Sequence, residues 1–316
     1  MRAYSIDQFG VPGSVGEQPA PDAGTGEILV RVRAAGVNAF DTAVVAGYVK
    51  DYMEHRFPLV PGLDASGVVE AIGEGVSGFS NGDEVVGISE RPFVGAGTFA
   101  QLVALPVLAS ARKPSTVGYV EAAALPTAGL TALSTVEAAD PKAGQTVVII
   151  GATGGVGSFA IQLAAARGAI VVAITRGDYA AYARELGATD TIDYTAGDPS
   201  DLLRARLPDG VDVLIDFAAD RALLARLADQ VRTGGSVVSS AGVVDVEALA
   251  KRGIRGTNAN RAAPGRLAEL VKLVDDGRIR VPATHTYRLE EAAAALQEQA
   301  GRHVRGKLVL DLSEDG

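Results

Sequence analysis

A glycine-rich turn carries the clearest chemical pattern in this chain. The apolar run Val147 to Ile150 leads into the residues GATGGVG at positions 151–157, and Phe159 to Arg167 then reads as a helix. Glycines in such a turn let the backbone approach a phosphate, and the free N–H groups at the helix N-terminus attract the anion. This A-x-G-x-x-G pattern predicts dinucleotide contacts, with a purely structural turn as the alternative, at Ala152, Thr153, Gly154, Gly155, Val156 and Gly157.

The end of the next strand indicates which dinucleotide is bound. After the apolar run Ile170 to Ile174 come Thr175 and Arg176, where NAD-binding proteins usually carry an acidic residue for the ribose hydroxyls. An arginine there pairs with the 2′-phosphate of NADP, so the sequence favours NADP over NAD. The alternative is that Arg176 is an ordinary solvated arginine. We interpret the nearby Asp178 as the N-cap of the following helix.

Several other kinds of site are excluded by missing residues. The chain has no cysteine, which excludes disulfides, thiolate nucleophiles and cysteine-ligated metals. The histidines His55, His285 and His303 lack the paired spacing of a zinc site. No Tyr-x-x-x-Lys pair and no Walker motif occurs, which argues against a short-chain dehydrogenase and a phosphoryl transferase.

Composition and charge are typical of a two-domain globular protein. The 316 residues are 47% hydrophobic and 21% charged, and single cores rarely grow past about 250 residues. The net charge of −9 argues against nucleic-acid and anionic-membrane partners. No leader-like segment opens the sequence and no apolar run approaches the roughly 18 residues of a membrane span, so we expect a soluble cytoplasmic protein.

The first third of the chain shows the pattern of a compact antiparallel β domain. Turn signals separate short apolar runs at Ile28 to Val32, Gly67 to Ile72, Glu84 to Ile88 and Phe99 to Val103. From Ser115 the sequence becomes rich in alanine and leucine, and Val120 to Ala139 reads as one helix before Pro141. We expect domains at residues 1–114 and 115–264, with residues 265–316 returning to the first domain.

The middle of the chain alternates short apolar strands with helices from Val147 to Thr257. Strands that are apolar throughout predict a parallel sheet covered by helices on both faces. The carboxyl ends of such strands form the dinucleotide site. Four further candidates for cofactor contacts follow the fourth and fifth strands, namely Phe217, Ala218, Ala241 and Gly242.

Seven short segments together resemble one enzyme family. They read GVNAFD (36–41), PGLDASGVV (61–69), GDEVVG (82–87), LPTAGLTA (125–132), GATGGVG (151–157), LGATDTIDY (186–194) and HVRGKLVL (303–310). The chain resembles the zinc-free quinone oxidoreductase branch of the medium-chain dehydrogenase/reductase superfamily, which includes the ζ-crystallin-like reductases. The resemblance implies an α/β fold with a GroES-like, mainly antiparallel β domain plus a Rossmann domain built on a doubly wound parallel sheet.

This resemblance implies a reductase that works without zinc. Zinc-dependent members carry cysteine and histidine ligands where this chain has Asn38 and Leu63, and the third ligand region, around Thr127, has no cysteine. The serine or threonine proton relay of the alcohol dehydrogenases is replaced by Phe40. What remains suits hydride transfer to a quinone or an enone, because the acceptor's own carbonyl takes up the charge.

The resemblance also implies roles for residues near the substrate. Asn38 would hydrogen-bond near the nicotinamide ribose or the substrate carbonyl, Thr127 would line the same cleft, and Asp41 would orient the loop; a buried turn asparagine and a helix threonine are the alternatives. Tyr48 resembles a family tyrosine at the substrate pocket, and Tyr52 follows one turn later on the same face if that stretch is helical. Either phenol would steer the substrate or donate a proton, or else pack on the domain rim.

The adenosine end of the cofactor has one matching residue and one departure from the family. Tyr194 resembles the family tyrosine that packs near the adenosine phosphate. Relatives often place a lysine in the helix after the second strand, whereas this chain has Tyr179 nearby. Arg176 would then hold the 2′-phosphate of NADP(H) alone.

Three functional hypotheses follow from these patterns. The leading one is an NADPH-dependent, zinc-free oxidoreductase that reduces a quinone or an α,β-unsaturated carbonyl compound. The second keeps the fold but makes the protein a tailoring enoyl or ketone reductase for a larger substrate. The third is a non-catalytic NADPH-binding structural or regulatory protein. The family resemblance also implies a homodimer.

Overall fold

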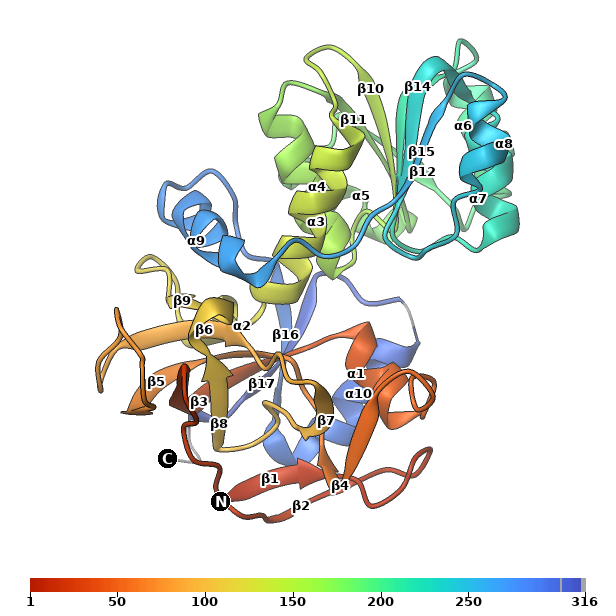
Figure 1. Cartoon of the computed structure of the whole chain (residues 1–316). Helices are drawn as coiled ribbons and strands as arrows, with labels where there is room; N and C mark the ends of the chain where they lie inside the picture. Colours follow the sequence, from red (N-terminus) through yellow and green to blue (C-terminus); the bar gives the residue numbers. More distant parts are fainter. Residues whose placement is uncertain (302, 314–316) are drawn as a thin grey trace. The chain divides into compact units, whose positions relative to one another are not determined.

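The structure is a computed structural model that describes residues 1–301 and 303–313, and these form two compact units (Figure 1). The first unit comprises Met1–Ala128 together with the C-terminal part of the chain from Ala263. The second unit comprises Gly129–Ala262. Among the described residues, no helix is long and apolar enough to cross a membrane.

The first unit is built on a seven-stranded sheet. Its strand order is β16-β17-β3-β5-β6-β9, and β8 pairs with β3 beside this path. All pairs are antiparallel except β16 with β17. The strands are β3 (Glu27–Val37), β5 (Asp64–Ile72), β6 (Glu84–Ile88), β8 (Leu102–Pro106), β9 (Ser110–Arg112), β16 (Ala283–Arg288) and β17 (Lys307–Asp311).

Smaller elements complete the first unit. Two-stranded sheets are formed by β1 (Arg2–Ser5) with β2 (Ser14–Glu17) and by β4 (Glu54–Val60) with β7 (Phe93–Ala96). The short helical segments are α1 (Ala39–Val45), η1 (Val107–Ala109), α2 (Tyr119–Ala123), η3 (Pro264–Arg266), α9 (Leu267–Asp275), η4 (Leu289–Glu291) and α10 (Ala292–Ala300). Helix α3 (Pro126–Ala139) begins in this unit and continues into the second.

The second unit is a six-stranded parallel sheet with the strand order β12-β11-β10-β13-β14-β15. The strands are β10 (Thr146–Ile150), β11 (Ile170–Thr175), β12 (Asp190–Asp193), β13 (Val211–Asp216), β14 (Val231–Ser239) and β15 (Arg255–Asn258). The helical segments are α4 (Gly155–Ala166), η2 (Gly177–Tyr179), α5 (Ala180–Glu185), α6 (Pro199–Arg206), α7 (Arg221–Ala228) and α8 (Val246–Ala250). Figure 1 shows α4 and α5 on one side of this sheet and α6, α7 and α8 on the other.

Hydrophobic patterning explains why the two sheets differ. In β3, Ile28, Val30 and Val32 are buried while Arg31 between them is only half-buried, as expected for a strand with one face on a core. In β10 the run Val147 to Ile150 is buried throughout, because helices cover both faces of the sheet. The expected combination of a mainly antiparallel β unit and a doubly wound parallel sheet is confirmed.

One predicted helix is divided in the structure. The sequence predicts a single helix from Val120 to Ala139, but the structure has α2 and α3 with a break at Ala124 and Leu125. The physical reason is Pro126, which has no N–H to continue a helix but is well accommodated as the first residue of a new one. The break matters because it places Thr127 in the first turn of α3.

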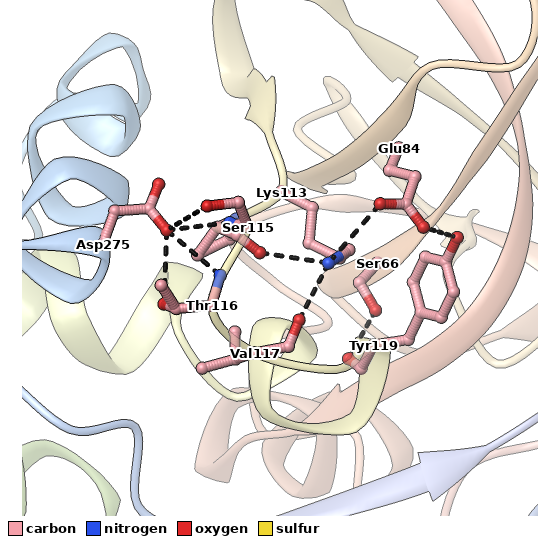
Figure 2. Close-up of polar contacts among 9 residues, drawn as sticks. Ser66, Glu84, Lys113, Ser115, Thr116, Val117, Tyr119 and Asp275 are labelled. Atoms are coloured by element: carbon pink, nitrogen blue, oxygen red, sulfur yellow. Dashed lines mark hydrogen bonds and ion pairs between the residues drawn. The ribbon is translucent and has the colours of Figure 1, made fainter.

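The segment that leaves β9 is bound firmly to the first unit (Figure 2). Asp275 of α9 accepts hydrogen bonds on one oxygen, Oδ1, from the backbone N–H groups and the hydroxyls of Ser115 and Thr116, at 2.8–3.2 Å. Lys113 donates to the carbonyls of Pro114 and Val117 at 3.0 and 2.8 Å. The compact units therefore divide between residues 128 and 129, later than the boundary expected at Ser115, and the second crossing lies between residues 262 and 263.

Candidate functional site

The glycine turn joins the carboxyl end of β10 to α4. Gly154 precedes the helix in an extended conformation, and Gly155, Val156 and Gly157 form its first turn. The N–H groups of a first helical turn have no carbonyl partner within the helix, and the helix dipole adds positive potential there. This end of α4 is therefore suited to hold the phosphates of a dinucleotide.

Two glycines of the turn are required by the close approach of backbone segments. A Cβ atom on Gly157 would lie 2.2 Å from the carbonyl oxygen of Gly151 and 2.7 Å from backbone atoms of Ala152. Gly151 has a φ of +68°, and a Cβ there would lie 2.9 Å from the Cβ of Ala218. Side chains at either position would push the turn away from β10 and from the loop after β13. The cradle therefore exists only with glycine at both positions.

Apart from Asn38 and Thr127, which belong to the first unit, the remaining predicted cofactor residues lie along the carboxyl edge of the same sheet. The parallel strands β10, β11, β13 and β14 end there, and Oγ1 of Thr153 lies 2.6 Å from Oγ1 of Thr175, which links the glycine turn to the end of β11. This edge brings together Ala152, Thr153, Gly154, Gly155, Val156, Gly157, Thr175, Arg176, Tyr194, Phe217, Ala218, Ala241 and Gly242.

A buried carboxylate that the sequence reasoning missed organises this edge. Asp216, at the end of β13, accepts hydrogen bonds from the N–H groups of Ala218 and Ala219 at 2.9 and 2.7 Å and from the hydroxyl of Ser239 at 2.7 Å. Ser239 in turn accepts from the N–H of Ala241 at 3.0 Å. Burial raises the pKa of Asp216, and these hydrogen bonds oppose the rise. Asp216 thus fixes the loops after β13 and β14.

Asp178 does not act as predicted. It lies inside η2 rather than before a helix, and no side-chain cap is formed at either η2 or α5. Instead its carboxylate accepts two hydrogen bonds from Arg176, from Nε at 3.1 Å and from Nη2 at 3.4 Å. The N-cap interpretation is therefore wrong, because the arginine two residues earlier is a stronger partner for the carboxylate than the backbone N–H groups of a short helical turn.

Two tyrosines lie close to Arg176. The Cζ atom of Arg176 is 5.6 Å from the centroid of the Tyr179 ring, a cation–π distance. The N–H of Tyr194 donates to the carbonyl of Thr175 at 3.1 Å, which holds the residue after β12 beside the end of β11. Burial raises the pKa of Tyr194, and the charge of Arg176 opposes the rise. Arg176 and Tyr194, both predicted for the adenosine end of the cofactor, thus lie at the ends of neighbouring strands, with Tyr179 beside Arg176.

In the first unit, Asn38 belongs to a buried polar network. Its Nδ2 donates to Oδ2 of Asp64 at 3.0 Å, and its Oδ1 accepts from Nζ of Lys307 at 2.7 Å. Lys307 also donates to the carbonyl of Val37 at 2.7 Å, and Thr127 donates to Asp64 from its hydroxyl at 2.6 Å. Four segments distant in the sequence therefore meet here: the end of β3, the start of β5, the start of α3 and β17.

The network fixes the orientation of the Asn38 amide. A lysine ammonium only donates and an ionised carboxylate only accepts, so the amide oxygen must face Lys307 and the amide nitrogen must face Asp64. The second hydrogen of Nδ2 has only a long contact, 3.4 Å to the carbonyl of Gly36. The amide of Asn38 therefore points its Nδ2 toward Asp64 and Gly36 and its Oδ1 toward Lys307.

Burial and charge attraction have opposite effects on the pKa values of this network. Burial raises the pKa of Asp64 and lowers that of Lys307, whereas the attraction between Nζ of Lys307 and Oδ2 of Asp64, 3.8 Å apart, opposes both shifts. Asp41 accepts a hydrogen bond from the N–H of Asn38 at 2.8 Å, and burial raises the pKa of Asp41 to about 7. Asp41 therefore fixes the start of α1 and adds a second buried carboxyl to the network.

Tyr48 and Tyr52 do not share a helical face. Helix α1 ends at Val45, and the residues from 46 to 52 form turns. The physical reason is Gly47, whose φ of +78° is incompatible with a continued right-handed helix. The two tyrosines are 79% and 85% exposed, so neither packs against the core of the first unit.

Asn38 and Leu63 stand where zinc-dependent members of the resembled family carry zinc ligands. Asn38 is bound by Asp64 and Lys307, and Leu63 directly precedes β5. Within residues 1–301 and 303–313, no three histidine, cysteine or acidic side chains are placed to hold a metal ion together. The polar side chains around Asn38 are thus those of Asp64, Lys307, Thr127 and Asp41.

Comparisons with known proteins agree with this arrangement. Residues 24–115 match the family model of the alcohol dehydrogenase GroES-like domain, and residues 186–310 match that of the zinc-binding dehydrogenases. The human mitochondrial NAD(P)H oxidoreductase RTN4IP1 is 30% identical over 90% of this chain and 82% of its own length. The chain belongs to the medium-chain dehydrogenase/reductase family, of the quinone oxidoreductase type.

Two further members of the family are similar to this chain. The 2-methylene-furan-3-one reductase of Solanum lycopersicum is 35% identical over 77% of this chain, and the alignment spans only 63% of its own length. The structure of the quinone oxidoreductase from Coxiella burnetii has a TM-score of 0.87 and 29% identity over 98% of this chain and 99% of its own. As a member of this family, the protein is an oxidoreductase with a nicotinamide cofactor.

Three residues of this medium-chain reductase escaped sequence reasoning. Asp64 and Lys307 lie within quoted segments, but nothing in their local sequence indicates that their side chains meet. Asp216 ends the mostly apolar strand β13 and is followed by Phe217 and two alanines; an acidic residue placed between such a strand and a loop is a detectable signal for a buried turn carboxylate. An acidic residue at the end of a mostly buried parallel strand is the pattern that would have identified it.

Proposed function

We propose that this medium-chain reductase transfers a hydride from NADPH to a quinone or an α,β-unsaturated carbonyl compound without a metal ion. The observation that carries the proposal is the phosphate cradle at α4, where Gly157 has no room for a side chain, with Arg176 at the end of the neighbouring strand. The same chemistry is supported by the names of three relatives: the human NAD(P)H oxidoreductase, the 2-methylene-furan-3-one reductase of Solanum lycopersicum and the quinone oxidoreductase of Coxiella burnetii.

The second unit binds and orients the cofactor, which supplies the hydride when bound. The N–H groups of Gly155, Val156 and Gly157 hold the pyrophosphate, because they are unpaired donors at the positive end of a twelve-residue helix. Arg176 pairs with the 2′-phosphate through charge-assisted hydrogen bonds. Asp216 keeps the loops after β13 and β14 in place on the nicotinamide side.

Asn38 holds the carbonyl oxygen of the acceptor. Hydride addition to a conjugated carbonyl moves negative charge onto its oxygen, and a hydrogen-bond donor aimed at that oxygen stabilises the charge. The hydrogen of Nδ2 that makes only the long contact to the carbonyl of Gly36 is such a donor, and Lys307 on the amide oxygen polarises it further. The proton that completes the reduction comes from solvent or from Tyr48 or Tyr52, which are both exposed.

A direct test follows the absorbance of NADPH with purified protein and a panel of quinones, enones and aldehydes, with and without a chelator. We expect consumption of NADPH on quinones or enones that the chelator does not reduce. Loss of activity with the chelator would contradict the metal-free proposal. Binding of NADPH without turnover of any acceptor would favour the non-catalytic alternative.

Removing Arg176 tests the preference for NADPH. We expect Arg176→Ala to weaken NADPH binding about 10- to 100-fold, the size of a lost charge-assisted hydrogen bond, and to change NADH binding less than about threefold. Fluorescence titration of each cofactor measures both constants. Arg252→Ala is the matched control, because Arg252 also pairs with an aspartate, Asp229, but lies near the amino ends of the strands. Equal losses for the two cofactors would contradict the phosphate role.

A further inference from the structure

The pairing of Arg176 with Asp178 bears on cofactor choice. The two side chains are 39% and 57% exposed and are joined by the two hydrogen bonds described above. The hydrogen bond to Asp178 raises the pKa of Arg176, so the guanidinium stays charged. The cation proposed for the 2′-phosphate is therefore already bound to a carboxylate of its own chain.

A second carboxylate adds negative charge nearby. Asp193, at the end of β12, lies so close to the backbone of Gly177 that a Cβ there would be 2.4 Å from Oδ2 of Asp193. Hydrogen bonds from the hydroxyl and the N–H of Thr195 lower the pKa of Asp193, and the charge of Arg176 contributes to the same shift. Arg176 thus has two carboxyl groups near it, that of Asp178, which it contacts, and that of Asp193.

The two carboxylates differ in how freely they can respond to a ligand. Asp193 is held by Thr195 and by the backbone beside Gly177, so it has a fixed structural role. Asp178 has hydrogen bonds only to Arg176 among those described, and an exposed ion pair of this kind contributes little net stability. A phosphate dianion can therefore displace Asp178 from Arg176, but the displaced carboxylate stays close to the phosphate and repels it.

For NADH, which has no 2′-phosphate, the carboxylate of Asp178 is favourable and not repulsive. The ribose hydroxyls of NADH are donors, and a carboxylate near the end of the second strand is the group that accepts from them in NAD-binding proteins. Asp178 lies two residues after Arg176 on the same short turn. Arg176 can thus bind the 2′-phosphate of NADPH, and Asp178 can accept hydrogen bonds from the ribose hydroxyls of NADH.

We propose that Asp178 is a specificity-determining residue that weakens NADPH binding and supports NADH binding, so that the enzyme uses both cofactors. This inference rests on the proposed cofactor site at Arg176. Arg176 favours the cofactor that carries the 2′-phosphate, and the negative charge of Asp178 reduces this preference. Removing the Asp178 charge converts a site of mixed use into one selective for NADPH.

The test compares the dissociation constants of NADPH and NADH for the wild type and Asp178→Asn by cofactor fluorescence. We expect NADPH to bind about tenfold more tightly and NADH about threefold more weakly. The gain for NADPH should shrink in 0.5 M salt, since exposed charges are screened, which a purely structural effect of the substitution would not do. Asp178→Ser, which also removes the charge, should move the NADPH constant in the same direction.

The matched control is Asp229→Asn, which removes the carboxylate of the Arg252 pair and leaves the net charge equal to that of Asp178→Asn. We expect it to leave both constants unchanged. A ratio of the two constants within twofold of the wild type in Asp178→Asn would overturn the inference. Calorimetry with adenosine 2′,5′-bisphosphate and AMP repeats the comparison without nicotinamide, so a failure of the reductase proposal would leave this test intact.

Discussion

We expect the Gly157→Val variant to lose dinucleotide binding, with the dissociation constants of NADPH and NADH both rising at least about 100-fold. The added Cβ would lie 2.2 Å from the carbonyl oxygen of Gly151, which is a backbone atom and cannot rotate away. The start of α4 must then shift, and the N–H groups that hold the phosphates lose their common direction. Cofactor fluorescence titration measures the loss.

A loss of binding supports the cradle only if the second unit stays folded. Circular dichroism and thermal unfolding of the variant test this. Gly157→Ala adds the same Cβ atom without the two further methyl groups of valine. Gly197→Ala is the control, because a Cβ there meets only the side chain of Leu202 at 3.8 Å, an ordinary contact distance. An unchanged affinity in a folded Gly157→Val variant would show that the phosphates are bound elsewhere.

The Lys307→Met variant should lose about 3–5 kcal/mol of unfolding free energy near neutral pH. Methionine keeps the apolar length of the side chain but removes the charge that faces Asp64 and the donor to Asn38 and Val37. A buried carboxylate is then left without a cation, and two acceptors are left without a donor. Chemical denaturation of the purified variant measures the change.

The pH dependence separates this electrostatic cause from simple repacking. Without Lys307 the pKa of Asp64, which burial already raises, is no longer opposed by the lysine charge. A carboxyl whose pKa is raised by folding stabilises the protein at low pH and loses that contribution as the pH rises through the folded pKa. The deficit of Lys307→Met should therefore be smaller near pH 5 than near pH 8. Lys272→Met, at an exposed position of α9, is the control and should cost less than about 1 kcal/mol.

A deficit of Lys307→Met that is equal at both pH values would contradict the assignment of its cause to the unpaired Asp64. A second check is the double variant with Asp64→Asn, which removes the uncompensated charge while keeping a side chain of the same shape. It should recover part of the stability lost in Lys307→Met. Failure to recover any would likewise contradict the account.

The parts of the site that the sequence predicted are those encoded within a short stretch. The glycine turn could be placed because strand, turn and helix follow one another, and each glycine has a local backbone reason. The loops after β13 and β14 could be placed because parallel strands all end at one edge. The doubly wound parallel sheet could be predicted from the alternation of buried strands and helices, whereas the order of its strands is known only from the structure.

The Asn38 network could not be predicted, because it depends on contacts between distant segments. Asp64 and Lys307 meet only because β17 and β5 both pair with β3, in the antiparallel register that joins Leu308 to Val37 and Asp64 to Gly36. No spacing along the chain contains that information. A sequence reading therefore identified Asn38 by resemblance but not the two groups that fix its amide.

Local competition accounts for two predictions that were wrong. Asp178 is a favourable N-cap residue, but Arg176 lies within reach and outweighs the backbone N–H groups. The single helix expected from Val120 to Ala139 has strong helix formers, but Pro126 imposes a new start. In both cases one nearby residue outweighed the general preference of a residue type, the N-cap preference of aspartate or the helix preference of alanine and leucine.

The most direct test of hydride transfer uses NADPH carrying deuterium at the transferable position of nicotinamide C4, with an enone that the panel shows to be reduced. Mass spectrometry and NMR of the product locate the label, with a chelator present throughout. The account predicts one deuterium at the β-carbon of the enone for each NADPH oxidised, with the balancing proton drawn from water. Reduced product without deuterium, or oxidation of NADPH without reduced product, would contradict it.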